Sequence, residues 1–208
     1  MNNFTLSRSA EAVFPTAVRL KSGRMVPVDA DFRTVLRCFN AFEDPNLTDD
    51  RKIFLLIRWF FKSTYVPNAG EVFASFVFDN DTAEDDPASM DFEQDADAIY
   101  ASFMEQYHID LFEIPYMHWK KFVVLIGGLS DKTALGRRIS IRDWDTSQLK
   151  GEEKIKADKA KRRFALKQKI SAAEKELQKK LDEALANGED PSEVLKALKA
   201  MYGGDPNG

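Results

Sequence analysis

The sequence has one cysteine, two histidines and no long apolar run. Cys38 has no second cysteine to pair with, and it lies in an apolar stretch with helical spacing. We therefore expect it to pack as a small hydrophobic residue in a reducing cytosol. The N-terminal residues lack the basic region and apolar run of a secretory signal. Because no apolar run approaches the roughly 18 residues of a membrane span, we expect a soluble intracellular protein.

The two histidines complete no recognisable catalytic or metal site. His118 follows the carboxylates Asp110 and Glu113, a setting that suits an acid–base catalyst. However, the other histidine, His108, lies across an expected helix break, and no cysteine is near enough to complete a zinc site. We therefore expect His118 to have a structural or capping role, and we predict neither an enzyme nor a bound metal or cofactor.

Alternating acidic residues over 91–97 resemble the start of a calcium-binding loop. Such a loop needs glycine at its sixth position and a bidentate glutamate at its twelfth. Counting from Asp91, these two positions hold Ala96 and Ser102. We therefore expect a solvated, acidic start of a helix at this place.

Charge is distributed unevenly along the chain. Residues 1–149 carry 16 Lys or Arg and 23 Asp or Glu, whereas residues 150–208 carry 14 and 11. The net charge therefore changes from −7 to +3 near residue 150. This change predicts a helical core domain over 1–149 and a charged helical arm with a frayed tail over 150–208.

Periodicity and turn residues predict a mainly α fold for the core. Alternating apolar residues on both sides of a Gly-containing turn indicate a short N-terminal β-hairpin over 16–28. The expected helices of the core span residues 32–42, 49–62, 67–77, 91–107, 115–126 and 131–141. Asp31 and Thr48 precede the first two helices as capping residues, and the acid-rich segment 79–90 is expected to be an exposed loop.

The arm combines a basic segment with an apolar stripe. Residues 154–169 hold eight Lys or Arg and one acid, Asp158. Apolar side chains then recur every three or four positions up to Asn187, which predicts one long amphipathic helix. The basic segment allows contacts with nucleic acid, but the chain's pI of about 5.4 and the acidic core disfavour them. Contact with an acidic protein surface, or simple solvation, fits better.

Two apolar surfaces are candidates for binding a partner protein. The expected helix 49–62 is apolar almost all round, so it is either central to the core or covered by a partner. The stripe of the arm exceeds what a core of this size needs, although the arm could equally fold back onto the core. The candidate residues are Phe54, Ile57, Trp59, Phe60 and Phe61 in the first surface and Leu166, Ile170, Leu177 and Leu181 in the second.

Several motifs between residues 91 and 129 resemble those of a bacteriophage family. They are the segments 91–103 (DFEQDADAIYASF), 106–111 (QYHIDL) and 117–122 (MHWKKF), followed by Gly128-Leu129. The chain resembles the "gene product fifteen" proteins of long-tailed phages and prophages of Gram-positive bacteria over about residues 10–165. Family members usually have Gly where His108 stands and a second Trp where Lys120 stands. The residues of the motif for which the resemblance implies a structural role are Ile99, Tyr100, Phe103, Tyr107, His118, Trp119 and Phe122.

The resemblance implies a role in phage tail assembly. In these phages the gene typically lies between those of the major tail protein and the tape-measure protein, where tail-assembly chaperones are encoded. Such a chaperone would bind the tape-measure protein in the host bacterial cytoplasm and keep it soluble, with other tail proteins as further candidate partners. The alternatives are a structural virion protein of the tail or head-to-tail junction, and a nucleic-acid-binding protein that uses 154–169. The sequence leaves a homo-oligomer open.

Overall fold

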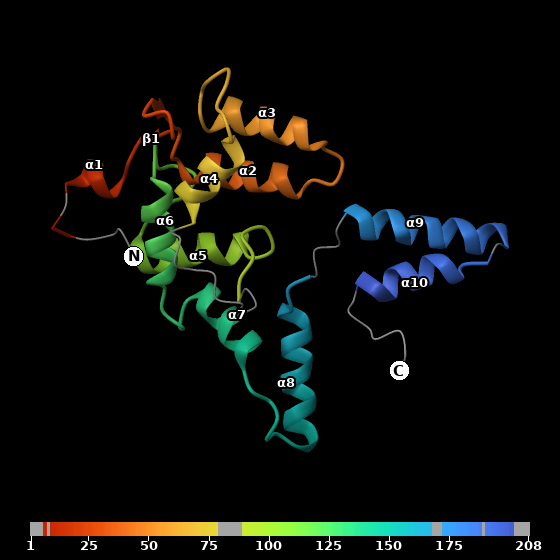
Figure 1. Ribbon diagram of the computed structural model, residues 1–208. Coiled ribbons are helices and arrows are strands. Elements are labelled where there is room, and N and C mark those ends of the chain that lie inside the picture. Colours follow the sequence, from red (N-terminus) through yellow and green to blue (C-terminus); the bar gives the residue numbers. More distant parts are fainter. Residues whose placement is uncertain (1–5, 8, 79–88, 168–171, 189, 202–208) are drawn as a thin grey trace. The chain divides into compact units, whose positions relative to one another are not determined.

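The computed structural model describes residues 6–7, 9–78, 89–167, 172–188 and 190–201. The chain forms two compact units, residues 1–166 and 167–208 (Figure 1). Within the described residues of the first unit, the elements are α1 (Ala10–Val13), β1 (Ala17–Arg19), β2 (Met25–Pro27), α2 (Phe32–Glu43), α3 (Asp49–Trp59), α4 (Ala69–Val77), α5 (Ala96–Tyr107), α6 (Trp119–Gly127), α7 (Ala134–Asp143) and α8 (Gly151–Phe164). The second unit contains α9 (Ala172–Asn187) and α10 (Ser192–Met201). The predicted mainly α fold with a short hairpin is confirmed.

The hairpin forms because two short alternating segments flank a turn that needs a glycine. β1 and β2 pair antiparallel with Val18 opposite Val26, and Gly23 adopts a positive φ of 84° in the turn. Val26 is buried and Val18 half-buried, so one face of the hairpin packs on the helices. Pro27 lies in β2, where it has no N–H to offer to a further strand.

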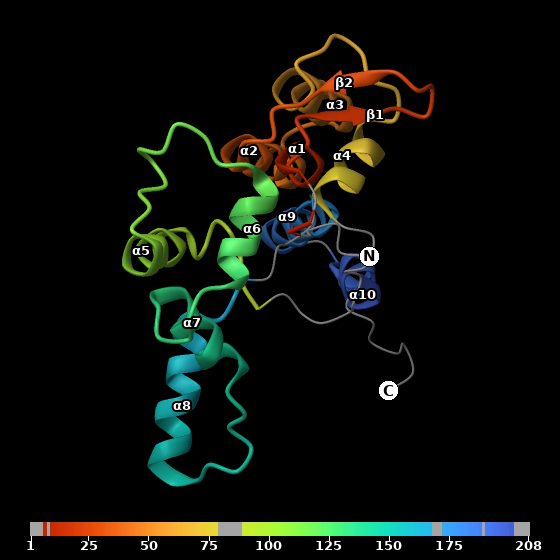
Figure 2. The same cartoon turned by 90° about the vertical axis from the view of Figure 1, so that its left-hand side faces the viewer.

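Capping side chains set the starts of several helices. Asp31 and Thr48 accept backbone hydrogen bonds from Arg33 and Arg51 at the starts of α2 and α3, which confirms both predicted caps. Thr133 caps α7 in the same way. Inside the unit, α2 packs against α3, and α6 runs from beside α2 toward α7 (Figure 2).

Several predicted helix boundaries are wrong by two to five residues, including the start of α7, which lies at Ala134 because Thr133 caps that helix. α5 begins at Ala96 and α6 at Trp119, because tight turns occupy residues 91–95 and 110–114. α3 ends at Trp59, and Pro67 stands outside α4 because Asn68 caps that helix with a left-handed backbone. The predicted acidic loop over 79–90 lies largely outside the described residues.

Aromatic side chains form a large part of the core, with eight of the 22 buried residues of its cluster. Phe32 stacks on Phe122 with ring centroids 4.3 Å apart, and the ring of Phe103 stacks on that of Phe122 at 5.4 Å. Cys38 is buried on α2 as predicted, and burial raises the pKa of its thiol to about 12. The largest fully buried side chains are Phe60, Phe61, Phe103, Phe122, Leu56 and Leu135.

Asp95 corrects the prediction of a solvated acidic helix start. Its side chain is fully buried, and both carboxylate oxygens accept hydrogen bonds from Arg142 at 2.7 Å. Arg138 adds a contact at 3.3 Å and also pairs with Asp97. Burial alone would raise the pKa of Asp95, but the hydrogen bonds from Arg142 and from the backbone N–H of Asp91 outweigh it and lower the pKa.

The arm also differs from the predicted single helix. Residues 154–187 form two helices, α8 and α9, and the backbone turns out of the helix at Ala165. α8 packs on α7 and belongs to the first unit, where the carbonyl of Phe164 accepts a hydrogen bond from Arg142. The change of unit therefore comes after Leu166, later than the change of charge near residue 150.

The second unit is a pair of packed helices. α9 ends at Asn187 as predicted, and Gly188 follows with a positive φ of 70°. α10 starts directly after Pro191 and packs against α9. The apolar stripe predicted on α9 therefore belongs to a helical hairpin.

Replacement of Arg142 by Ala tests the buried ion pair. Arg142→Ala leaves the carboxylate of Asp95 buried without its main partner, so we expect the free energy of unfolding to fall by about 3–5 kcal/mol. Urea unfolding followed by circular dichroism measures this loss. Arg137→Ala on the exposed side of α7 is the matched control and should change stability by less than about 0.5 kcal/mol. Equal losses in the two variants would contradict the role of the pair.

His108 tests the end of α5. It follows the helix with φ 54°, and its backbone N–H bonds back to the carbonyl of Phe103. Glycine adopts this left-handed conformation without the clash of a Cβ atom. We expect His108→Gly to raise the free energy of unfolding by about 0.5–1 kcal/mol, whereas His108→Ala, which keeps the Cβ atom, should not. A stabilisation by both variants would place the cause elsewhere.

Candidate protein-binding surface

The candidate residues of α3 and of the two positions after it divide into buried and accessible ones. Phe60 and Phe61 are 0% exposed, so neither side chain is accessible to a partner in this fold. Phe54 is 53% exposed, and the guanidinium of Arg51 lies over its ring. Ile57 and Trp59 are half-buried. Of this set, only Phe54 presents most of its surface to solvent.

The candidate residues of the arm do not form one stripe. Leu166 is half-buried at the end of the first unit, whereas Leu177 and Leu181 are half-buried on α9 of the second unit. Ile170 lies outside the described residues. The break at Ala165 separates the positions that a continuous helix would have aligned.

An apolar pocket with a volume of about 200 Å³ lies among α2, α5, α6 and the connection from α5 to α6. Three of the motif residues, Ile99, Tyr100 and Phe122, line it. Pockets for small ligands typically have volumes of about 300–1,000 Å³, so this one suits a single apolar side chain. The complete lining is Phe32, Arg33, Leu36, Phe92, Ala96, Ile99, Tyr100, Leu111, Phe112 and Phe122.

Phe112 is the most exposed aromatic residue of this pocket. It is 81% exposed, and its ring centroid lies 5.3 Å from that of Tyr100. A tight turn presents it: Asp110 accepts a hydrogen bond from the backbone N–H of Phe112 at 2.8 Å. The hydroxyl of Tyr100 donates to the other oxygen of Asp110 at 3.0 Å. The backbone bond from Phe112 is the main cause of the lowered pKa of Asp110.

Polar contacts hold the remainder of this connection. Arg33 donates to the carbonyl of Ile114 at 3.1 Å while its guanidinium pairs with Asp31 at 2.8 Å. Asp31 also accepts a hydrogen bond from the backbone N–H of Met117 at 3.1 Å. Burial alone would raise the pKa of Asp31, but the hydrogen bonds from Arg33 and Met117 outweigh it and lower the pKa. The connection is thus fixed at both ends while Phe112 stays exposed.

His118 joins the connection to the N-terminal part of the unit. It faces Asp31 in an antiparallel bridge, and its Nδ1 caps α6 by accepting from the backbone N–H of Lys120 at 3.1 Å. Nε2 therefore carries the proton and donates to the carbonyl of Pro15 at 3.1 Å. This geometry confirms the predicted capping role. Burial lowers the pKa of His118, with a smaller contribution from the charge of Lys120.

The other motif residues also have structural contacts. Phe103 is fully buried, and Trp119 is 4% exposed while its indole N–H donates to the carbonyl of Val77 at 3.3 Å. The hydroxyl of Tyr107 donates to the carbonyl of Leu125 at 2.8 Å. These three residues tie α5 and α6 to the core, which leaves Tyr100 as the motif residue that reaches the rim of the pocket.

The sequence-based prediction missed Phe112 and Leu111. A detectable pattern was present, because Asp110 is followed at the second position by a large aromatic residue that fits no helical stripe. In the described parts of the chain, no group of three or more His, Cys, Asp or Glu side chains is placed to hold a metal ion. No helix there is long and apolar enough to cross a membrane.

The buried His118 makes stability depend on pH. Below about pH 6.5 the unfolded chain takes up a proton that the folded histidine resists, so the free energy of unfolding should fall as the pH is lowered. His118→Asn keeps a capping side chain but cannot titrate, so its stability should fall less between pH 7 and pH 5 when both proteins are unfolded with urea. His108→Asn removes the exposed histidine and should keep the fall of the unchanged protein. If the free energy of unfolding of His118→Asn falls as much as that of the unchanged protein, the pH dependence does not come from His118.

Comparison with known proteins places this unit in a family. Residues 15–166 match the model of the bacteriophage Gp15 protein family, and the match ends at the last residue of the first compact unit. Searches of curated proteins and of solved structures gave no match. The matched region contains both the pocket beside Phe112 and the two buried carboxylates, Asp31 and Asp95. This chain belongs to the bacteriophage Gp15 protein family.

Proposed function

We propose that this phage protein is a tail-assembly chaperone that binds the tape-measure protein. The observation that carries the proposal is the exposed ring of Phe112 beside an apolar pocket. All residues that line this pocket lie within the region that matches the family, residues 15–166. Large aromatic residues that stay exposed next to a pocket are typical of protein-binding surfaces. The motif resemblance and its usual gene position point to the tape-measure protein as the partner.

The pocket matches the physical problem that such a chaperone solves. A long helical protein with an apolar stripe aggregates unless other surfaces cover that stripe. The pocket accepts one apolar side chain, and Phe112 offers an aromatic surface next to it, so together they suit one or two turns of an amphipathic helix. The acids Asp110 and Glu113 flank Phe112 and favour a helix with basic residues beside its stripe.

The proposed activity is binding without chemistry in the host cytoplasm. Within the described residues, the buried titratable side chains Asp31, Asp95 and His118 each accept a hydrogen bond from a backbone N–H. The thiol of Cys38 is buried and stays protonated near neutral pH because its pKa is about 12. These engagements support a scaffold for recognition.

Co-expression with the tape-measure protein tests the proposal. We expect the tape-measure protein to remain soluble and to co-purify with this chain, and Phe112→Ala to abolish both effects. Because Phe112 is 81% exposed, the substitution should change the free energy of unfolding by less than about 0.5 kcal/mol. A tape-measure protein that is equally insoluble with and without the unchanged chain would disprove the proposal.

Two further substitutions separate the surfaces. Phe54→Ala removes the exposed aromatic residue of α3, which the sequence favoured, and Ile155→Ala removes a 68% exposed apolar residue of α8. We expect both variants to retain the partner. If Phe54→Ala alone loses it, the binding surface is α3. Mass spectrometry of purified particles separates a chaperone, absent from the virion, from a structural tail protein present in a fixed copy number.

A further inference from the structure

The two edges of the hairpin differ in the hydrogen-bond donors that they offer, and the edge of β1 is the more open one. The bonds Val28 N–H to Thr16 C=O and Leu20 N–H to Arg24 C=O place the even-numbered residues of β1 on the side that pairs with β2. The N–H and C=O groups of Ala17 and Arg19 therefore point away from β2. Within the described part of the chain, neither of these two N–H groups donates a hydrogen bond.

The opposite edge of the hairpin offers fewer donors, because Met25 is the one residue of β2 with an outward N–H. Pro27 has no N–H, so it offers no outward donor on β2. Just beyond β2, the backbone N–H of Asp29 donates a hydrogen bond to the carbonyl of Phe60 at 2.7 Å, which attaches the chain to the helices. β1 therefore supplies the edge at which a further strand can add to this sheet.

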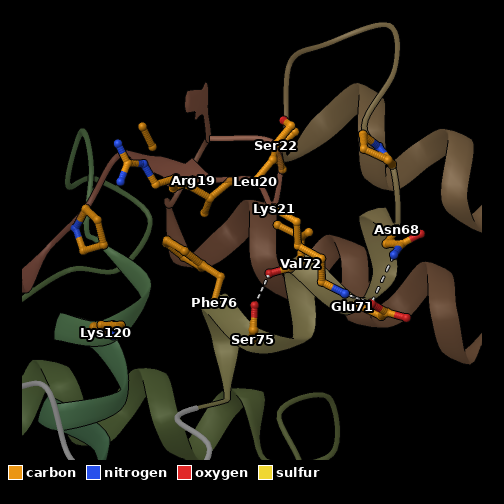
Figure 3. A pocket seen from close by; sticks show the side chains of 14 residues that line it. Arg19, Leu20, Lys21, Ser22, Asn68, Glu71, Val72, Ser75, Phe76 and Lys120 are labelled. Atoms are coloured by element: carbon orange, nitrogen blue, oxygen red, sulfur yellow. Dashed lines mark hydrogen bonds and ion pairs between the residues drawn. The ribbon is translucent and has the colours of Figure 1, made fainter. Parts of the chain in front are cut away.

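A groove lies directly beside the open edge. It separates β1 from α4 and has a volume of about 550 Å³ (Figure 3). Leu20, Val72 and Phe76 project into it between the strand and the helix. Its lining includes all of β1, a length of roughly 10 Å in extended backbone, and continues into the turn at Lys21 and Ser22. We call this space the β1 groove.

The charges around the β1 groove are mostly positive. Arg19, Lys21 and Lys120 line it, and the one carboxylate in the lining is Glu71. Lys21 already pairs with that carboxylate at 3.6 Å, and both side chains are largely exposed. Arg19 is exposed, and its guanidinium lies beside the strand (Figure 3). This basic lining is unusual for a region, residues 1–149, with a net charge of −7.

We propose that the β1 groove binds an extended, acidic peptide segment of a partner protein by β-augmentation. The backbone of that segment would bond to the outward groups of Ala17 and Arg19, and its apolar side chains would enter the space beside Val72 and Phe76. Its carboxylates would face Arg19 and Lys21. Main-chain bonds supply affinity in this mode, and alternate side chains supply specificity.

A second copy of this chain fits the groove less well. In an antiparallel β1–β1 pair centred on Val18, the side chains of Lys21 would face Pro15 of the other copy, which has no N–H to donate. The pair would also make the Arg19 residues of the two copies diagonal neighbours on one face, about 7–8 Å apart, where like charges repel. An acidic segment has neither difficulty.

Fluorescence anisotropy with defined peptides tests the proposal. The probe is a labelled peptide of about eight residues in which valine and glutamate alternate, matched to a lysine version and to a version with alternate N-methylated amides. We expect saturable binding of the glutamate peptide and at least about tenfold weaker binding of the other two. Equal binding of the N-methylated peptide, or no saturable binding of the glutamate peptide, would overturn the proposal.

Two proline substitutions locate the binding edge. Ala17→Pro removes an outward N–H of β1 without removing a bond of the hairpin, so binding should weaken at least about tenfold. Met25→Pro places the same residue on the outer edge of β2 and is the matched control that should bind normally. Circular dichroism and thermal unfolding of both variants show whether the fold is kept. If only Ala17→Pro is unfolded, Arg19→Glu replaces it, and unchanged affinity of that variant would overturn the proposal.

Two controls test whether peptide binding depends on the β1 groove. Phe112→Ala should bind the acidic peptide as the unchanged protein does, because the apolar pocket lies elsewhere on the unit. Analytical ultracentrifugation reports self-association. A dimer that Ala17→Pro dissociates and Met25→Pro does not would assign the open edge to a second copy and overturn the peptide proposal.

Discussion

The first unit depends on the neutralisation of one buried carboxylate. Asp95 is fully buried, and an unpaired charge at such a place would cost several kcal/mol. Arg142 and Arg138 supply the opposite charge from successive turns of α7, and Arg142 also reaches the end of α8 at Phe164. The turn before α5, the face of α7 and the last turn of α8 are therefore held together by one set of polar contacts.

The second buried carboxylate explains why the candidate pocket stays accessible. Asp31 and Arg33 hold the connection between α5 and α6 through hydrogen bonds to Met117 and Ile114. Connections are more often fixed by the burial of their apolar side chains, which then cannot meet a partner. Here the polar contacts fix the backbone of the connection. The connection therefore stays ordered although the ring of Phe112 is exposed. A rigid exposed aromatic side chain loses little entropy on binding.

Local signals in the sequence predicted most of the fold, and long-range contacts account for what those signals missed. The caps at Asp31 and Thr48 depend on neighbouring residues, and both were correct. The burial of Asp95 was not predictable in this way, because its partners come from α7. The pocket was missed for the same reason, since it exists only where α2, α5 and α6 meet. Periodicity likewise cannot show which apolar helix is central. Phe60 and Phe61 were therefore predicted as candidates for binding a partner, although both are buried.

The family match and the first compact unit end at the same residue, 166, and this bears on how the gene evolves. Residues 15–166 match the family, and residues up to 166 form one compact unit with its own core cluster. A unit that has its own core can keep its fold when recombination adds, removes or exchanges the segment after it. Selection can therefore act on the helical hairpin α9–α10 as a separate module, while Asp31 and Asp95 keep the shared unit intact.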